Sequence, residues 1–136
     1  MKSIEITEFQ PEGYKPLVDY ESWRVAVLKF CDDLRPENLR TMQKHNESDE
    51  VFVLLSGECS LFAGGYGEAP GQIEVFEMQP LRIYNVKKGA WHTHTLSADG
   101  VVLIVENKNT CDDNSPTKPL SGEQIKELHA ACARFL

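Results

Sequence analysis

Two short polar runs of this sequence place histidine beside acidic residues at the borders of strand-like segments. The first, MQKHNESDEVFVLLSG (42–57), has His45 and Glu50 on the two sides of an acidic turn. In the second, NVKKGAWHTHTL (85–96), His92 and His94 follow a Lys-Gly turn and alternate onto one face of the next strand. Imidazole nitrogens and carboxylate oxygens are common ligands of divalent transition metals. The two runs together predict a metal site.

The side-chain alternation of a strand indicates how the first run could arrange its groups. Thr41, Gln43 and His45 share one face, and Glu50 shares a face with the apolar residues of the next segment. We expect Asn46–Asp49 to close a hairpin, so that His45 and Glu50 lie close together at its end.

Strand signals dominate the rest of the chain. Short segments rich in β-branched and aromatic residues are separated by Gly, Pro, Asn or Asp at most breaks. They are residues 23–30, 39–45, 51–57, 58–65, 72–78, 81–86, 90–96 and 101–107. Such a series predicts an all-β antiparallel sandwich or barrel. Residues 64–72 are expected to form a hairpin loop, and the polar, proline-containing stretch 107–121 a long loop.

One helix is expected, over about 121–135. Ser121 and Gln124 have the spacing of a capping box, and apolar residues recur at helical spacing behind them. The helix is expected to cover the outside of the sheet. With no internal repeat and no linker composition, residues 1–136 are interpreted as a single domain.

Composition excludes several classes of function. The chain has 136 residues and a formal charge of −7, and it lacks the clustered Lys and Arg of a nucleic-acid-binding surface. It contains no run of about 20 apolar residues that could span a membrane. The first residues lack the apolar core of a signal peptide, and the four cysteines form no CxxC pair. The expected location is therefore the cytoplasm, with reduced cysteines.

The two polar runs resemble the two sequence motifs of the cupins, a family of small β-barrels. The first cupin motif is His-x-His, three or four residues, Glu, six residues, Gly, and residues 43–57 read Gln43-x-His45, four residues, Glu50, six residues, Gly57. The second motif ends in Pro-x-Gly, two residues, His, and residues 87–92 read Lys87-x-Gly89, two residues, His92. The resemblance implies a cupin-like double-stranded β-helix, or jelly-roll barrel, with a short C-terminal helix.

The same resemblance implies a site. At the matching positions cupins bind a divalent metal such as Fe, Mn, Ni or Zn, which assigns His45, Glu50 and His92 as ligands. Gln43 stands where cupins have their first histidine, and an amide oxygen is a weaker ligand than imidazole for these metals. Gln43 and His94 are therefore candidates for an additional ligand or a substrate contact. The alternative is that the site has lost its metal.

Two functional hypotheses follow. In the first, the chain is a divalent-metal-dependent enzyme, such as a lyase, isomerase or dioxygenase, that acts on a small oxygen-rich substrate, a carboxylic acid or a sugar derivative. In the second, it is a non-enzymatic cupin that binds a small molecule or sugar at a degenerate or metal-free site. The resemblance also implies a homodimer, for which the strand-like segment 1–10 could add to a neighbour's sheet.

Overall fold

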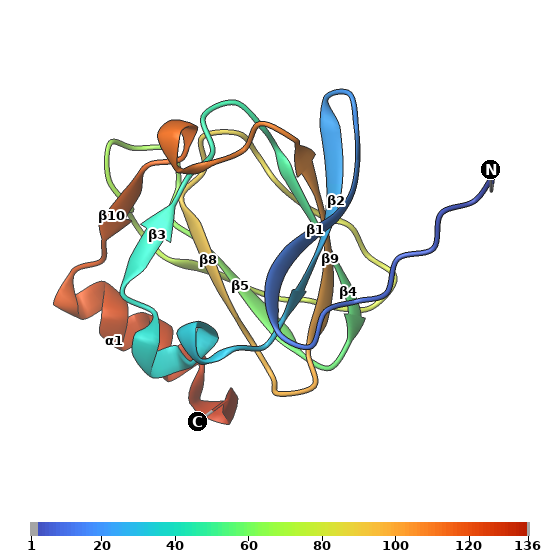
Figure 1. Cartoon of the computed structure of the whole chain (residues 1–136). Coiled ribbons are helices and arrows are strands. Elements are labelled where there is room, and N and C mark those ends of the chain that lie inside the picture. The colour runs from blue at the N-terminus through green and yellow to red at the C-terminus, as the bar shows by residue number, and fades with distance from the viewer. Residues whose placement is uncertain (1–2, 136) are drawn as a thin grey trace.

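The computed structural model describes residues 3–135. Within that range the chain forms two five-stranded antiparallel sheets around a common interior (Figure 1), with strand orders β1-β2-β9-β4-β7 and β10-β3-β8-β5-β6. The strands are β1 (Gly13–Tyr20), β2 (Trp23–Lys29), β3 (Thr41–Gln43), β4 (Glu50–Ser56), β5 (Cys59–Ala63), β6 (Glu74–Glu77), β7 (Tyr84–Val86), β8 (His92–Leu96), β9 (Val101–Asn107) and β10 (Thr117–Pro119). The helix α1 spans Gly122–Ala131, and single 3-10 turns occupy Asp32–Leu34, Pro36–Asn38, Asp112–Asn114 and Ala133–Phe135. The expected all-β barrel with a C-terminal helix is confirmed.

Each of the eight expected segments contains a strand, but the sequence pattern missed two others. β1 contains Pro16, which lacks an N–H group and therefore argues against a central strand. It is tolerated because β1 lies at the edge of its sheet, where the register with β2 shifts between Pro16 and Val18. β10 has three residues and pairs with β3, so the expectation of a continuous loop over 107–121 is wrong at Thr117–Pro119.

The expected hairpin across Asn46–Asp49 is also wrong. β3 pairs with β8 and β10 in one sheet, whereas β4 pairs with β7 and β9 in the other. Residues 46–49 therefore cross from one sheet to the other. His45 and Glu50 still meet, because both side chains turn into the interior between the sheets. The hairpin expected at 64–72 is confirmed by the pairing of β5 with β6.

Two apolar clusters hold the sheets in place. The cluster between the sheets consists of Ala26, Leu28, Phe52, Leu54, Cys59, Leu61, Met78, Leu96, Val102 and Ile104. The second joins α1 to the outer side of the β10–β6 sheet and consists of Leu39, Met42, Phe62, Trp91, Leu120, Leu128 and Cys132. Adjacent residues of β5 enter different clusters, as strand alternation requires. The helix begins at the expected capping box and ends at Ala131, earlier than the sequence pattern predicted.

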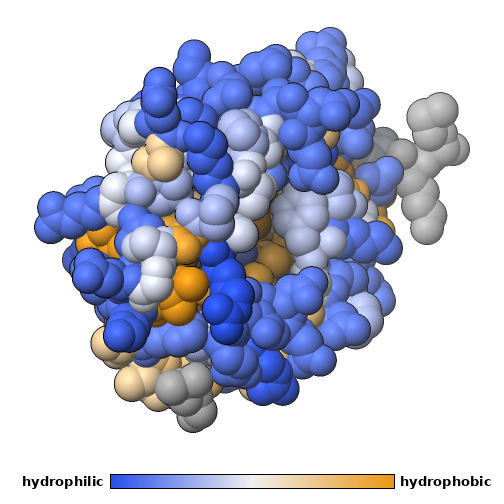
Figure 2. Space-filling view, turned by 90° about the vertical axis from the view of Figure 1, so that its left-hand side faces the viewer, coloured by the Kyte–Doolittle hydropathy of each residue, from blue (hydrophilic) through white to orange (hydrophobic). Residues whose placement is uncertain are grey.

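The surface is mainly polar on the side of the molecule that Figure 2 shows, with apolar residues gathered in a few small areas. Residues 3–12 form no strand, and Ile4 and Ile6 in this segment are strongly exposed. Of the segment 1–10, for which strand pairing was expected, residues 1–2 lie outside the described range. No helix within residues 3–135 is both long and apolar enough to cross a lipid bilayer.

Candidate metal centre

The interior of the barrel contains a cavity of about 670 Å³. Both sheets contribute to its wall, together with residues of the segment 110–117, which runs from the β9–β10 connection into the start of β10. This volume lies within the range of about 300–1,000 Å³ that is usual for small-molecule sites. His45, Glu50 and His92 all line the cavity, as do Gln43 and His94.

His45, Glu50 and His92 converge on a single point in the wall, although they come from different parts of the chain. His45 lies two residues beyond the end of β3, Glu50 is the first residue of β4, and His92 is the first residue of β8. The Nε2 atoms of His45 and His92 lie 3.0 and 2.9 Å from the same atom, Oε1 of Glu50. One ligand atom from each residue lies within 4.8 Å of the other two, and all three residues are buried. We call these residues the His-Glu-His cluster.

The turn before β8 fixes His92 relative to the end of β3. Gly89, with a positive φ of 83°, donates its backbone N–H to the carbonyl oxygen of His45 at 2.8 Å. Gln43 is the register partner of His92 across the two strands. The Lys-x-Gly-x-x-His spacing therefore has a structural role, because its turn holds the start of the His92 strand against His45, just beyond β3.

The other ring nitrogen of each histidine is held by a hydrogen-bond acceptor. Nδ1 of His92 lies 3.0 Å from the carbonyl oxygen of Ala90, which can only accept. Nδ1 of His45 lies 2.8 Å from the hydroxyl of Ser115, and this hydroxyl donates its own hydrogen to Oδ1 of Asn114. Nδ1 of His92 therefore carries the proton, and the Ser115–Asn114 hydrogen bond favours the same tautomer in His45; in a neutral ring Nε2 then presents a lone pair to Glu50. A lone pair facing a carboxylate oxygen is repulsive, so the arrangement requires a proton or another cation between them.

The electrostatics of the metal-free cluster agree with this geometry. Burial alone would raise the pKa of Glu50, but the hydrogen bonds of His45 and His92 outweigh burial and hold that pKa well below its ordinary value. Burial would lower the pKa of His92, but the hydrogen bond and charge of Glu50 raise it. Both shifts favour an ion pair of Glu50 and His92 when no metal is bound.

A second polar cluster, which sequence reasoning missed, lies beside the first. Glu106 is the register partner of Glu50 between β9 and β4, and its side chain is 2% exposed. Its Oε2 accepts hydrogen bonds from the hydroxyl of Tyr14 and from Nε and Nη2 of Arg24, the latter two at 3.0 and 2.8 Å. Burial and the neighbouring Glu50 raise the pKa of Glu106. The sequence signal was an acidic residue in phase with Val102 and Ile104, the inward positions of β9.

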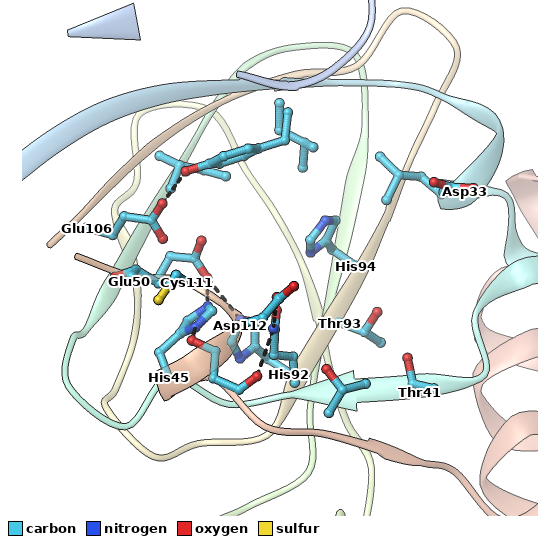
Figure 3. A pocket seen from close by; sticks show the side chains of 18 of the residues that line it. Asp33, Thr41, His45, Glu50, His92, Thr93, His94, Glu106, Cys111 and Asp112 are labelled. Carbon is cyan, nitrogen blue, oxygen red and sulfur yellow. Dashed lines mark hydrogen bonds and ion pairs between the residues drawn. The ribbon is translucent and has the colours of Figure 1, made fainter. Parts of the chain in front are cut away.

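The structure places the two additional candidates differently. Nε2 of Gln43 donates to the carbonyl oxygen of Ser115 at 3.0 Å and lies 3.5 Å from Oδ1 of Asp112, so its amide is tied to the 110–117 segment. His94 lines the cavity away from the cluster (Figure 3), and its buried Nδ1 has no hydrogen-bond partner among the described residues. Burial lowers the pKa of His94 to about 4, so its ring is neutral. For both residues a ligand or substrate contact stays a prediction.

Comparison with known proteins gives matches in structure but not in sequence. No protein-family model matches the sequence, and no curated protein matches it. Solved structures of cupins do match this chain, which has the same two antiparallel sheets around an interior site. The chain therefore has the cupin fold, and the resemblance inferred from the two motifs is confirmed for the fold.

Three solved structures illustrate the likeness. A cupin-2 domain protein from Shewanella frigidimarina is 14% identical, with a TM-score of 0.52 over 74% of this chain and 85% of its own. Streptomyces Pac13, solved with uridine, is 11% identical, with a TM-score of 0.58 over 91% of this chain and 97% of its own. Pac13 is described as a nucleoside dehydratase. WlaRA of Campylobacter jejuni, a TDP-fucose-3,4-ketoisomerase, is 16% identical, with a TM-score of 0.53 over 80% of this chain and 75% of its own. At these identities the likeness shows the fold alone.

Proposed function

We propose that this chain is a divalent-metal-dependent enzyme that acts on a small oxygen-rich substrate, with His45, Glu50 and His92 as the metal ligands. The observation that carries the proposal is the orientation of the two histidines. Each ring directs Nε2 at Oε1 of Glu50, and the partners of the Nδ1 atoms favour a proton there, inside a cavity large enough for a small molecule. A divalent cation between these atoms would turn the repulsion of two lone pairs and a carboxylate into coordination.

The residues present fit such an ion. Two imidazoles and a carboxylate suit Fe, Mn, Ni or Zn, and three protein ligands leave coordination positions for substrate or water. The metal would supply Lewis-acid chemistry, polarising a carbonyl group or activating water or O₂. Ser115 and the carbonyl of Ala90 would keep the two rings oriented, and Glu106 with Tyr14 would line the wall next to the ligands. Lyase, isomerase and oxygenase reactions are all compatible with this arrangement.

One observation favours the second candidate, a metal-free small-molecule or sugar-binding cupin. The contact between His92 and Glu50 is a satisfied hydrogen bond without metal when His92 is protonated, and the pKa shifts of Glu50 and His92 both favour that ion pair. A cluster that is stable without metal could serve as a polar wall for a ligand.

Metal content distinguishes the two candidates. Protein purified without chelators or a histidine tag is measured by elemental mass spectrometry, before and after incubation with Mn²⁺, Fe²⁺, Ni²⁺ and Zn²⁺. The enzyme proposal expects close to one ion per chain, lost in His92→Gln and in Glu50→Gln. The matched control is His129→Gln on α1, far from the cluster in sequence and outside the cavity lining. Wild-type protein that neither contains nor takes up metal would refute the metal site, as would equal metal content in His92→Gln and His129→Gln.

The proposal extends to assembly and location. The exposed Ile4, Ile6 and Phe9 on the segment before β1 are apolar side chains that a second copy could cover, which supports a homodimer. Sedimentation of the full chain beside a chain lacking residues 1–10 tests this, and a monomeric full chain would exclude it. Four free cysteines fit a reducing compartment such as the cytoplasm.

A further inference from the structure

The charged side chains of the cavity are mostly acidic. Four carboxylates line it, and the one Lys or Arg side chain in the lining is Arg24. The acidic residues are Asp33, Glu50, Glu106 and Asp112. Glu106 is paired with Arg24, and Glu50 belongs to the His-Glu-His cluster. Among residues 3–135, no Lys, Arg or His lies within ion-pair distance of Asp33 or Asp112. Both are solvent-exposed residues that line the cavity, on different sides of it (Figure 3).

The guanidinium and amide donors of the wall, on Arg24 and Gln43, are already engaged. Arg24 donates Nε and Nη2 to Glu106, and it also donates to the carbonyl oxygens of Lys108 and Thr110 at 3.1 and 3.0 Å. The amide of Gln43 donates to the carbonyl of Ser115. A guanidinium committed to three protein acceptors cannot form the bidentate contact by which arginine binds carboxylates and phosphates. The lining therefore holds no Lys or Arg side chain that is free to bind an anion.

Acceptors, in contrast, remain directed at the cavity. The hydroxyl hydrogen of Tyr14 is committed to Glu106, so the Tyr14 oxygen can only accept a further hydrogen bond. The carboxylates of Asp33 and Asp112 are acceptors without a cation, and the hydroxyls of Thr41 and Thr93 lie on the same wall as Asp33 (Figure 3). A ligand with several hydrogen-bond donors would pair with these carboxylate and phenol oxygens, and the threonine hydroxyls can either accept or donate.

We propose that the natural ligand is a neutral, hydroxyl-rich molecule, such as a sugar or a nucleoside, and that a carboxylated or phosphorylated relative is rejected. Hydroxyl groups supply the donors that the acceptors need, and the apolar side chains of Leu28, Leu34 and Ile104 line the same cavity, where they suit the carbon face of a sugar ring. The inference rests on the site proposed above and narrows its substrate from carboxylic acids or sugar derivatives to uncharged sugar derivatives.

A bound metal would not reverse this preference. A divalent ion with Glu50 would carry one net positive charge, and Asp33 and Asp112, which are solvent-exposed and partly screened, carry two negative charges. The formal charge of −7 on the whole chain adds a repulsion that acts on any anion approaching the cavity. An anionic ligand would be repelled by the two aspartates and by the net charge of the chain, whereas a neutral ligand would not be repelled by either.

Matched ligand pairs test the inference. Uridine is compared with uridine 5′-monophosphate, and galactose with galacturonate, by ligand-observed NMR titration up to millimolar concentrations. Each titration is made on metal-loaded and on chelator-treated protein. We expect the neutral member of at least one pair to bind at least about tenfold more tightly than its anionic partner, which corresponds to about 1.4 kcal/mol. Asp33→Asn and Asp112→Asn should tighten binding of the anionic member and leave the neutral member nearly unchanged. Asp99→Asn, in the β8–β9 turn and outside the cavity lining, is the control.

Three results would overturn the inference: equal or tighter binding of the anionic members, no binding of either neutral member, or equal effects of Asp112→Asn and Asp99→Asn. The experiments distinguish failure of this inference from failure of the metal-enzyme proposal. Neutral preference in a chain that takes up no metal would keep the inference and remove the enzyme proposal. Stoichiometric metal together with a preference for anionic ligands would keep the enzyme proposal and remove the inference.

Discussion

Replacing Glu50 by glutamine should destabilise the metal-free protein by an amount that depends on pH. The substitution keeps the size of the side chain and removes the charge that holds His45 and His92 together. Hydrogen bonds to a charged group contribute about 1.5–3 kcal/mol each, and Glu50 accepts two. Removing the cost of burying a carboxylate returns part of that sum. We therefore expect a net loss of about 2–4 kcal/mol in the free energy of unfolding where both contacts are fully formed.

The pH dependence follows from the two pKa shifts. The pKa of Glu50 is lowered in the folded state, so its contribution is complete above its ordinary pKa of 4.5 and is lost as the pH falls below that value. The pKa of His92 is raised, so its contribution is complete below its ordinary pKa of 6.5 and is lost as the pH rises through the folded-state pKa. The difference between wild type and Glu50→Gln should therefore be largest between pH 4.5 and 6.5 and should shrink on either side.

The assay is urea unfolding of chelator-treated wild type and Glu50→Gln at pH 5.5 and pH 9, followed by circular dichroism. Glu127→Gln, an exposed position on α1, is the matched control and should show no difference at either pH. A Glu50→Gln effect of equal size at pH 5.5 and pH 9 would refute the reasoning, because it would mean that Glu50 acts through packing and not through a charged contact with His92.

Two further substitutions test the turn and the histidine orientation. Gly57 has a positive φ of 69°, and a Cβ there would lie 2.7 Å from backbone atoms of Gly100. Gly57→Ala should lower the free energy of unfolding by about 1–3 kcal/mol or more. Gly65→Ala is the control, because Gly65 also has a positive φ but lies in open space, and it should lower that free energy less. Equal losses in urea unfolding would contradict a clash at Gly57. Ser115→Ala removes the acceptor of His45 Nδ1 and should weaken metal affinity about 10–100-fold, measured with a competing chelator. Unchanged affinity beside the Ser56→Ala control, whose hydroxyl bonds Asp99 elsewhere, would show that Ser115 does not orient the ring.

The sequence predicted those features of the fold whose signals lie within a few neighbouring residues. The strands with clear alternation and the capping box of α1 were predicted because their signals lie within a few residues. The placement of β3 and β4 in different sheets was not predicted. A polar turn of four residues between two strands has the same sequence signature whether the chain turns back as a hairpin or crosses to a second sheet. The wrong hairpin nevertheless gave the right neighbours, since either path brings His45 beside Glu50.

The parts of the site that sequence missed depend on contacts between distant residues. Glu106 meets Glu50 through strand register over a separation of more than fifty residues, and Tyr14 reaches Glu106 from an edge strand whose proline concealed it. Ser115 lies in a stretch expected to be loop, and only the folded chain places its hydroxyl on His45. The three ligand candidates had a motif to mark them, whereas the groups that orient them had none.

The segment between β9 and β10 connects the two halves of the proposed chemistry. Its Ser115 holds the ring of His45, while its Asp112 faces the cavity where the ligand is proposed to bind. The same segment is anchored by Arg24, through the carbonyl oxygens of Lys108 and Thr110, to the Glu106 that lies beside Glu50. A substitution that releases this anchor, such as Arg24→Met, would leave Glu106 buried without its cation and free the segment that carries Ser115. Metal ligation and ligand selection are therefore expected to fail together when Arg24 is lost, even though Arg24 touches none of the three metal ligands directly.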